Sequence, residues 1–195
     1  AYYSLGCDSG ELFDDTKIAG DADYRKYMNK YNVIHLDIAS FWDYYKENIV
    51  EKIIEYINKD FQNVFGNELN YENGFSYNLM LICQKTDTPF VIIIDEWDVL
   101  IRDEAANKKV QEKYINFLRA MFKGTEPTKY IQLAYLTGIL PIKKEKTQSA
   151  LNNFDEFTML SAGVFAPYIG FTNDEVRLLC SNYNRDYEKV KRWYD

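Results

Sequence analysis

Three apolar runs in the sequence end on polar residues that could do chemistry together. Asp95-Glu96 follows the run 90–94, Thr137-Gly138 follows the run 130–136, and Asp37 lies near the end of the run 32–38. The working residues of a parallel sheet lie at the carboxyl ends of its strands, so a site is expected where these residues meet. An acid pair at such a place is suited to holding a divalent cation and directing a water molecule.

The run 90–94 with Asp95 and Glu96 resembles the Walker B segment of P-loop ATPases that carry a catalytic glutamate. In such a segment the aspartate holds Mg²⁺ beside the β- and γ-phosphates, and the glutamate orients and polarises the attacking water. The alternative is a buried strand that meets a solvated turn, because five apolar residues followed by two acids fit that description as well.

Thr137 ends the next strand along the chain, where it would lie beside the tip of the Walker B strand. A hydroxyl there can contact the γ-phosphate or the attacking water, as at the position called sensor 1. The alternative is a strand-end turn that uses Gly138. For Asp37 the two readings are an approach to the nucleotide and a cap on the following helix.

The sequence lacks the phosphate-binding part of such a site. It contains no G-x-x-x-x-G-K-[ST] element and no Gly-Lys pair, and Gly6 and Gly10 lack the accompanying lysine and hydroxyl. Without this loop the β- and γ-phosphates have no ready anion site. We therefore expect the chain as printed to bind nucleotide poorly or not at all.

Strand-like runs alternate with helical patterns along the chain. The strands are expected at 32–38, 90–94, 130–136 and 157–160, and the helices at 47–57, 76–84, 108–123 and after the capping box of Thr172 and Glu175. Gly124 is placed to end the third helix. Apolar strands of this kind are expected to be buried on both faces, so the alternation predicts an α/β fold with a mainly parallel sheet and helices on both faces.

Composition narrows the class of protein. The chain has 195 residues, with 30 acidic against 23 basic side chains and a net charge of −7, so this segment does not favour nucleic-acid binding. No apolar run approaches the roughly 20 residues of a membrane-spanning helix. The scattered Cys7, Cys83 and Cys180 with a single histidine argue against a zinc site and indicate a reducing cytoplasm. His35, inside an apolar strand, is expected to be a core residue.

From Leu12 to Phe171 the chain resembles the predicted AAA-ATPase-like family of bacterial and archaeal proteins, whose members often carry a C-terminal nuclease-like domain. The stretches that carry the resemblance follow the family's order and are Tyr31-Asn32-Val33-Ile34-His35-Leu36-Asp37, Val91-Ile92-Ile93-Ile94-Asp95-Glu96-Trp97-Asp98, Leu136-Thr137-Gly138-Ile139-Leu140-Pro141-Ile142, Ser149-Ala150-Leu151-Asn152-Asn153-Phe154 and Gly170-Phe171-Thr172.

The resemblance implies a three-layer P-loop-type sheet and a protein that binds and hydrolyses ATP with Mg²⁺. Asp95 would hold the metal, Glu96 would orient the water and Thr137 would act as the sensor. In the family the P-loop precedes the segment that matches Ala1, so the resemblance implies one domain over 1–195 that lacks its first strand and P-loop and stops at the start of a lid region. The alternative is a non-enzymatic interaction module on a degenerate nucleotide-binding fold. A homo-oligomer is left open.

Other polar residues are assigned more loosely. Lys143, with Lys144 and Lys146, is either a second sensor or part of a solvated lysine run. Asn152 and Asn153 are either polar contacts of the nucleotide or local turn residues. Arg102, Arg119 and Arg177 are expected at surface helix positions.

Overall fold

A computed structural model describes residues 1–66, 69–70, 74–141, 151 and 153–193. Residues 1–153 form one compact unit and residues 154–195 another, where the sequence predicts a single domain over 1–195. Each unit is described by itself. None of the described helices combines the length and the apolar character needed to cross a bilayer.

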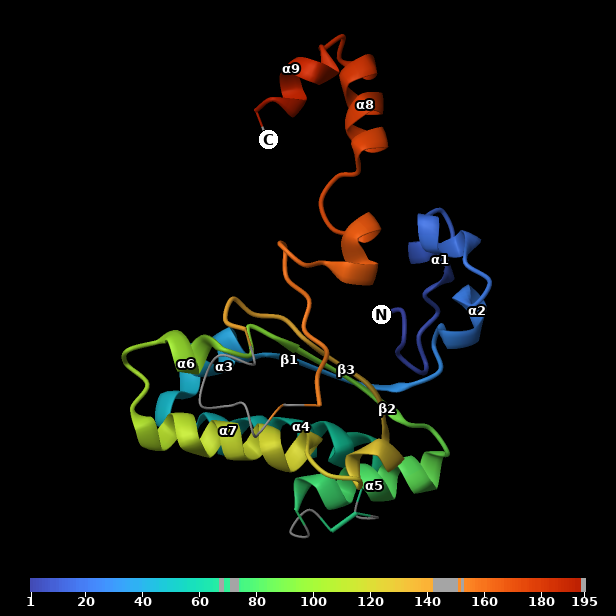
Figure 1. Cartoon of the computed structure of the whole chain (residues 1–195). Helices are drawn as coiled ribbons and strands as arrows, with labels where there is room; N and C mark the ends of the chain where they lie inside the picture. The colour runs from blue at the N-terminus through green and yellow to red at the C-terminus, as the bar shows by residue number, and fades with distance from the viewer. Residues whose placement is uncertain (67–68, 71–73, 142–150, 152, 194–195) are drawn as a thin grey trace. The chain divides into compact units, whose positions relative to one another are not determined.

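The elements of the first unit alternate between helix and strand after a short-helical N-terminal segment (Figure 1). They are α1 (Gly10–Phe13), α2 (Tyr24–Tyr27), β1 (Asn32–Asp37), α3 (Ile38–Tyr45), α4 (Ile49–Phe65), α5 (Phe75–Thr86), β2 (Phe90–Asp95), α6 (Val99–Arg102), α7 (Lys108–Phe122) and β3 (Ile131–Leu136). Single 3₁₀ segments span Lys17–Gly20, Lys46–Asn48 and Pro127–Lys129.

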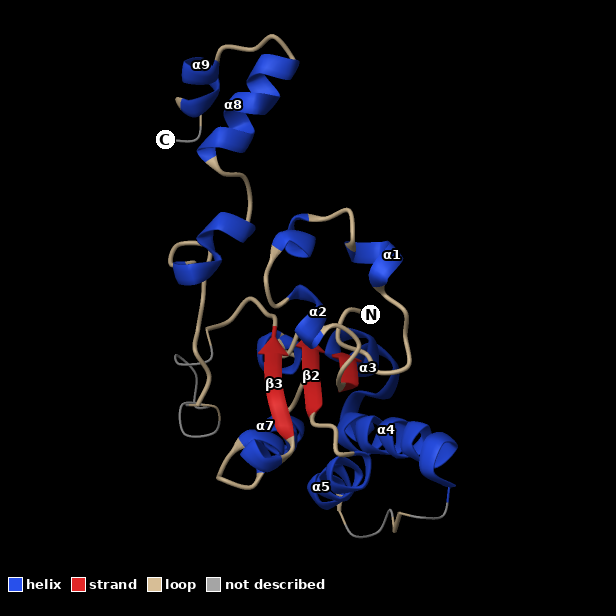
Figure 2. Ribbon diagram, turned by 90° about the vertical axis from the view of Figure 1, so that its right-hand side faces the viewer, coloured by secondary structure: helices blue, strands red, loops and turns tan. Residues whose placement is uncertain are grey.

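The three strands form a parallel sheet in the order β1-β2-β3 (Figure 2). Asp37 pairs in register with Asp95, and Ile94 pairs with Leu136. The strands therefore end together at one edge of the sheet. This arrangement confirms the predicted α/β fold with a parallel sheet flanked by helices.

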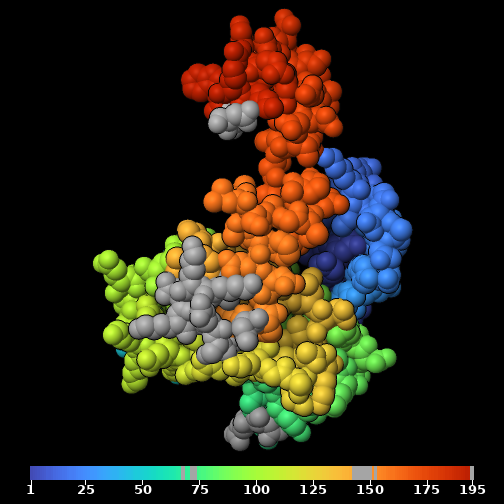
Figure 3. Space-filling view, in the orientation of Figure 1, coloured from blue at the N-terminus to red at the C-terminus, as the bar shows by residue number. Residues whose placement is uncertain are grey.

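One face of the sheet packs against helices. Ile34 and Leu36 of β1 and Ile92 and Ile94 of β2 are buried on this face. Figures 1 and 2 both show α4, α5 and α7 grouped on one side of the sheet. Their apolar stripes supply the rest of the core, with Ile53, Ile57, Leu79, Ile82, Tyr114 and Leu118 all nearly inaccessible. Figure 3 shows α7 and the residues that lead into β3 on the visible surface, in yellow-green to yellow.

The opposite face of the sheet is partly open. The expectation that the strands are buried on both faces is therefore correct only for β2. His35 of β1 pairs with Ile93, which pairs with Tyr135 of β3, so the three share this face. His35 is exposed, and Leu133 and Tyr135 are 40% and 52% exposed. The prediction of a core histidine is therefore wrong, because alternation places His35 on the open face while Ile34 and Leu36 point into the core.

The predicted helix boundaries are confirmed for α7, which begins at the N-cap Asn107 and ends before Gly124, whose φ is 104°. The Asn107 side chain accepts the Val110 backbone N–H at 3.1 Å. A positive φ of this size is easily adopted only by glycine, which is why the helix can stop there. Helix α4 covers the predicted segment 47–57 from Ile49 but continues to Phe65, and α5 covers the predicted segment 76–84.

The second unit contains a 3₁₀ segment at Gly163–Tyr168 followed by α8 (Asn173–Asn182) and α9 (Tyr187–Lys191). The capping box of Thr172 and Glu175 is present at the start of α8, as predicted. The fourth strand predicted at 157–160 is wrong. Thr158 and Ser161 instead bond to each other through their backbones, so this run closes a local turn.

Candidate functional site

Asp95 and Thr137 meet where β2 and β3 end. The Thr137 backbone N–H donates to Ile94 at 2.9 Å, and the Trp97 N–H donates to the Thr137 carbonyl at 3.0 Å. These bonds continue the parallel pairing by one residue beyond the strands. The Thr137 hydroxyl consequently reaches Asp95 and donates a hydrogen bond to its Oδ1.

Glu96 turns the chain out of the sheet directly after Asp95. Its φ of 53° lies in the left-handed region, which non-glycine residues adopt at a cost. Its backbone N–H donates to Asp95 Oδ1 at 3.1 Å and lies 3.4 Å from the Thr137 hydroxyl oxygen. The turn therefore fixes the Glu96 backbone against both neighbouring side chains.

Asp98 and Arg102 complete the cluster, and the sequence reasoning missed both. Asp98 is fully buried, and its Oδ2 accepts the Arg102 Nε–H at 2.9 Å. A second guanidinium nitrogen of Arg102 bonds to the Glu96 carboxylate. Arg102 is thus an ion-pair residue with a side chain 28% exposed, and not the plain surface position expected from its helix. The four-residue spacing of Asp98 and Arg102 on one helical turn is the signal that could have found the pair.

The loop that follows β2 packs against α7 and against Gly138 of the loop that follows β3. The Tyr114 hydroxyl donates to the Trp97 carbonyl at 2.9 Å inside the core, and burial raises the pKa of Tyr114. A Cβ atom at position 138 would lie 2.5 Å from Asp98 Oδ1 and 2.7 Å from the Trp97 ring, so glycine is required there. The loop after β2 and the loop after β3 are therefore packed together.

Of the two roles that the sequence suggests for Asp37, the structure shows the cap on the following helix. Its carboxylate accepts the Ser40 backbone N–H at 3.1 Å and the Ser40 hydroxyl at 2.6 Å, at the start of α3. These hydrogen bonds lower the pKa of Asp37 below its usual range. Asp37 still lies at the strand position next to Asp95. The site edge of the sheet therefore carries two neighbouring carboxylates, Asp37 bonded to the start of α3 and Asp95 bonded to Thr137 and the Glu96 backbone.

Residues 1–147 match the family model described as Predicted AAA-ATPase, which is three quarters of the chain. The chain belongs to the Predicted AAA-ATPase family. No curated protein and no solved structure matches it. The stretches at 149–154 and 170–172, which also carry the sequence resemblance, lie beyond the matched residues of this family.

Among the remaining residues predicted for the site of this AAA-ATPase-like chain, only Asn153 is described by the structure, and it does not lie at Asp95. Asn153 donates to the Phe122 carbonyl at 3.1 Å, at the C-terminal end of α7. That end of α7 leads into the amino end of β3, opposite to the edge where Thr137 lies. Lys143 and Asn152 are outside the described residues.

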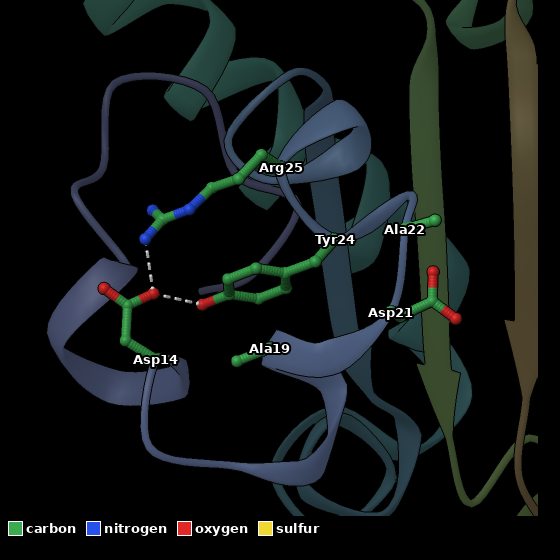
Figure 4. A pocket seen from close by; sticks show the side chains of 6 residues that line it. All are labelled: Asp14, Ala19, Asp21, Ala22, Tyr24 and Arg25. Atoms are coloured by element: carbon green, nitrogen blue, oxygen red, sulfur yellow. Dashed lines mark hydrogen bonds and ion pairs between the residues drawn. The ribbon is translucent and has the colours of Figure 1, made fainter.

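A pocket in the N-terminal segment is lined by Asp14, Ala19, Asp21, Ala22, Tyr24 and Arg25 (Figure 4). Its polar side chains form hydrogen bonds within the same N-terminal segment. Asp14 Oδ1 accepts the Tyr24 hydroxyl and an Arg25 N–H, each at 2.7 Å, and these contacts lower the pKa of Asp14. Asp21 accepts the Asp23 backbone N–H at 2.8 Å. These bonds explain the local fold of the segment without a ligand.

The donor set at the sheet edge suits Mg²⁺ held together with phosphates. Mg²⁺ is typically bound by one or two carboxylates, with water and phosphate oxygens completing its shell. Asp95 offers an exposed carboxylate and Thr137 a hydroxyl beside it. Within the described parts of the chain, no three His, Cys, Asp or Glu side chains gather closely enough to enclose a metal by themselves.

Proposed function

We propose that this chain carries the water-activating half of a Mg²⁺-dependent ATPase site. Asp95 would hold Mg²⁺, Glu96 would orient the attacking water, and Thr137 would contact the γ-phosphate or that water. The observation that supports this most strongly is the hydrogen bond between Thr137 and Asp95 at the ends of adjacent parallel strands, with Glu96 next in the chain. Ligands of open α/β sheets bind at this edge.

The proposed roles follow from what each side chain can do. MgATP, when bound, supplies the phosphoryl group and a metal that offsets its charge. Thr137 holds Asp95 in place through its hydroxyl, so the carboxylate faces the edge of the sheet in a fixed orientation. Glu96 is half exposed and can accept a proton or a hydrogen bond from water.

We further propose that residues upstream of Ala1 supply the phosphate-binding loop. The printed sequence contains no Gly-Lys pair, and so has no Walker A element of its own. Among the described strands β3 pairs only with β2, which leaves its other edge available for a further parallel strand. Lys143 and Asn152 stay predictions for contacts of the same nucleotide.

Thermal denaturation with and without MgATP tests the proposal. We expect no ligand-dependent change in Tm for the 195-residue chain, because it lacks an anion site, and a rise in Tm for a chain extended at its N-terminus through the upstream residues. A clear rise for the 195-residue chain would contradict the assignment of phosphate binding to upstream residues.

Glu96→Gln tests the catalytic assignment in the extended chain. We expect phosphate release from ATP to slow by about 100-fold or more, because glutamine keeps the shape but cannot accept a proton. Glu112→Gln, on the exposed side of α7, serves as the matched control and should leave the rate unchanged. Equal rates for wild type and Glu96→Gln would remove Glu96 from the reaction.

The alternative of a non-enzymatic interaction module has its own support in the missing Gly-Lys pair and in the open sheet face with Leu133 and Tyr135 exposed. On that reading the extended chain shows neither an ATP-dependent rise in Tm nor phosphate release. The same two measurements therefore separate the alternatives.

A further inference from the structure

Arg102 joins two acids that differ in their surroundings. Its Nε–H donates to Asp98, whose side chain is fully buried, and another guanidinium N–H donates to Glu96, whose side chain is 42% exposed. Among the described residues, Arg102 is the partner that the Glu96 carboxylate has. The orientation of the Glu96 side chain therefore depends on where Arg102 is held.

Asp98 holds Arg102 from inside the protein. Its Oδ2 accepts the backbone N–H groups of Ile139 at 3.1 Å and Leu140 at 2.7 Å, as well as the Arg102 Nε–H. Ile139 and Leu140 follow Thr137 in the loop after β3. Asp98 thereby ties the guanidinium to the loop that also carries the Thr137 hydroxyl.

We propose that Arg102 is the positioning residue of Glu96, and that Asp98 ties this position to the loop after Thr137. The inference rests on the proposed ATPase function, in which Glu96 directs the attacking water. Arg102 acts by keeping the carboxylate in one place, and it does not contact the substrate in this scheme. Movement of the loop after β3 would then move Glu96 as well.

The geometry separates this contact from an ordinary surface ion pair. Exposed pairs hold their side chains loosely, because both ends are free to move and water screens the charges. Here one end is fixed by a buried carboxylate that also accepts two backbone hydrogen bonds. The planar guanidinium reaches both acids at once, which the single ammonium group of lysine does not reproduce.

Arg102→Lys in the extended chain is the central test, because lysine keeps a positive charge beside buried Asp98 while losing the two-armed contact. We expect kcat for ATP to fall by about 10- to 100-fold with KM within about threefold of wild type, since a misplaced group weakens the transition state more than binding. Arg119→Lys is the matched control. Arg119 bonds to Asn116 on its own helix, and its replacement should leave both constants unchanged.

Two further variants test whether Arg102 acts through Glu96: Asp98→Asn, and Arg102→Lys combined with Glu96→Gln. Asp98→Asn should lower kcat in the same way, although Asp98 does not touch Glu96. In a Glu96→Gln background, Arg102→Lys should cause no further loss of rate, because the side chain that it positions is already inactive. A wild-type kcat for Arg102→Lys, or an equal further loss in the Glu96→Gln background, would overturn the proposal.

A double-mutant cycle on thermal stability keeps this inference distinguishable from the proposed function. In the 195-residue chain we expect Glu96→Gln to lower Tm by about 1–3 °C with Arg102 present, and by clearly less with Arg102→Lys. Equal losses in both backgrounds would overturn the contact itself. If the extended wild type hydrolyses no ATP, the proposed function fails, while coupling in the cycle would still establish that Arg102 holds Glu96.

Discussion

Asn78 is a buried core residue whose side-chain amide lacks hydrogen bonds within the described part of the chain. It is fully buried in α5, and neither its Oδ1 nor its Nδ2 has a hydrogen-bond partner among the residues that the structure describes. A buried amide without partners loses its hydration and gains nothing in return, which costs about 1–3 kcal/mol. Leucine has a similar volume and no polar atoms, so it suits the same space.

We therefore expect Asn78→Leu to stabilise the chain by about 1–3 kcal/mol, measured as the free energy of unfolding in urea. Asn107→Ala provides a contrast of opposite sign, because the Asn107 side chain caps α7 and its loss should cost about 1 kcal/mol. A destabilising Asn78→Leu would show that the amide contributes to the fold in a way that its missing partners do not reveal.

The loops after β2 and β3 act as one packed element, with Gly138 at their contact. A Cβ atom at 138 would clash with Asp98 Oδ1 and the Trp97 ring. We expect Gly138→Ala to destabilise the chain by about 1–3 kcal/mol through this overlap, visible as a lower Tm. Gly20→Ala is the control, because a Cβ there meets no atom within 4 Å. Similar Tm values for the two variants would contradict the close packing of the loops.

The helices and strands that the sequence predicts correctly are those whose apolar residues follow a regular spacing within one segment. The apolar period places α4, α5 and α7, and the run 90–94 places β2, because packing in these segments follows directly from residue spacing. The run 157–160 fails because apolar character alone does not supply a pairing partner, and Thr158 bonds to Ser161 instead. The predicted burial of His35 is wrong because α4, α5 and α7 pack on the other face of the sheet, where Ile34 and Leu36 point (Figures 1 and 2).

At the candidate site, too, the sequence predicts some contacts, while others depend on how the loops pack in three dimensions. Adjacency of Asp95 and Thr137 follows from parallel strand order, which the sequence pattern predicts. The ion pairs of Arg102 depend on the turn at Glu96 and on the approach of Ile139 and Leu140 to Asp98. Only the Asp98–Arg102 pair has a spacing that the sequence shows, four residues on one helical turn. The Glu96–Arg102 contact needs the turn at Glu96, and the two backbone hydrogen bonds to Asp98 need the packing of the two loops.

For the molecule as a whole, the division after Asn153 makes a prediction about folding. Residues 1–153 form a compact unit with its own core, which includes the fully buried Leu151. We expect a chain that ends at Asn153 to unfold in one cooperative transition with Tm within about 3 °C of the corresponding transition of the full chain. Calorimetry of the two chains measures this directly.

Leu151→Ala in the shortened chain is the matched control. Removing a buried leucine side chain costs about 2–5 kcal/mol, so Tm should fall clearly. Loss of cooperative unfolding in the chain that ends at Asn153 would mean that residues 154–195 are needed for the fold of the first unit.

The backbone at Glu96 bears on whether the molecule works as an enzyme or as a scaffold. A φ of 53° suits glycine, and a glutamate held there costs roughly 1 kcal/mol of folding free energy. Exchange for glycine would relieve this backbone strain but would also remove the ion pair with Arg102. Under the proposed function, position 96 gives up part of its backbone stability in exchange for a carboxylate at the end of β2.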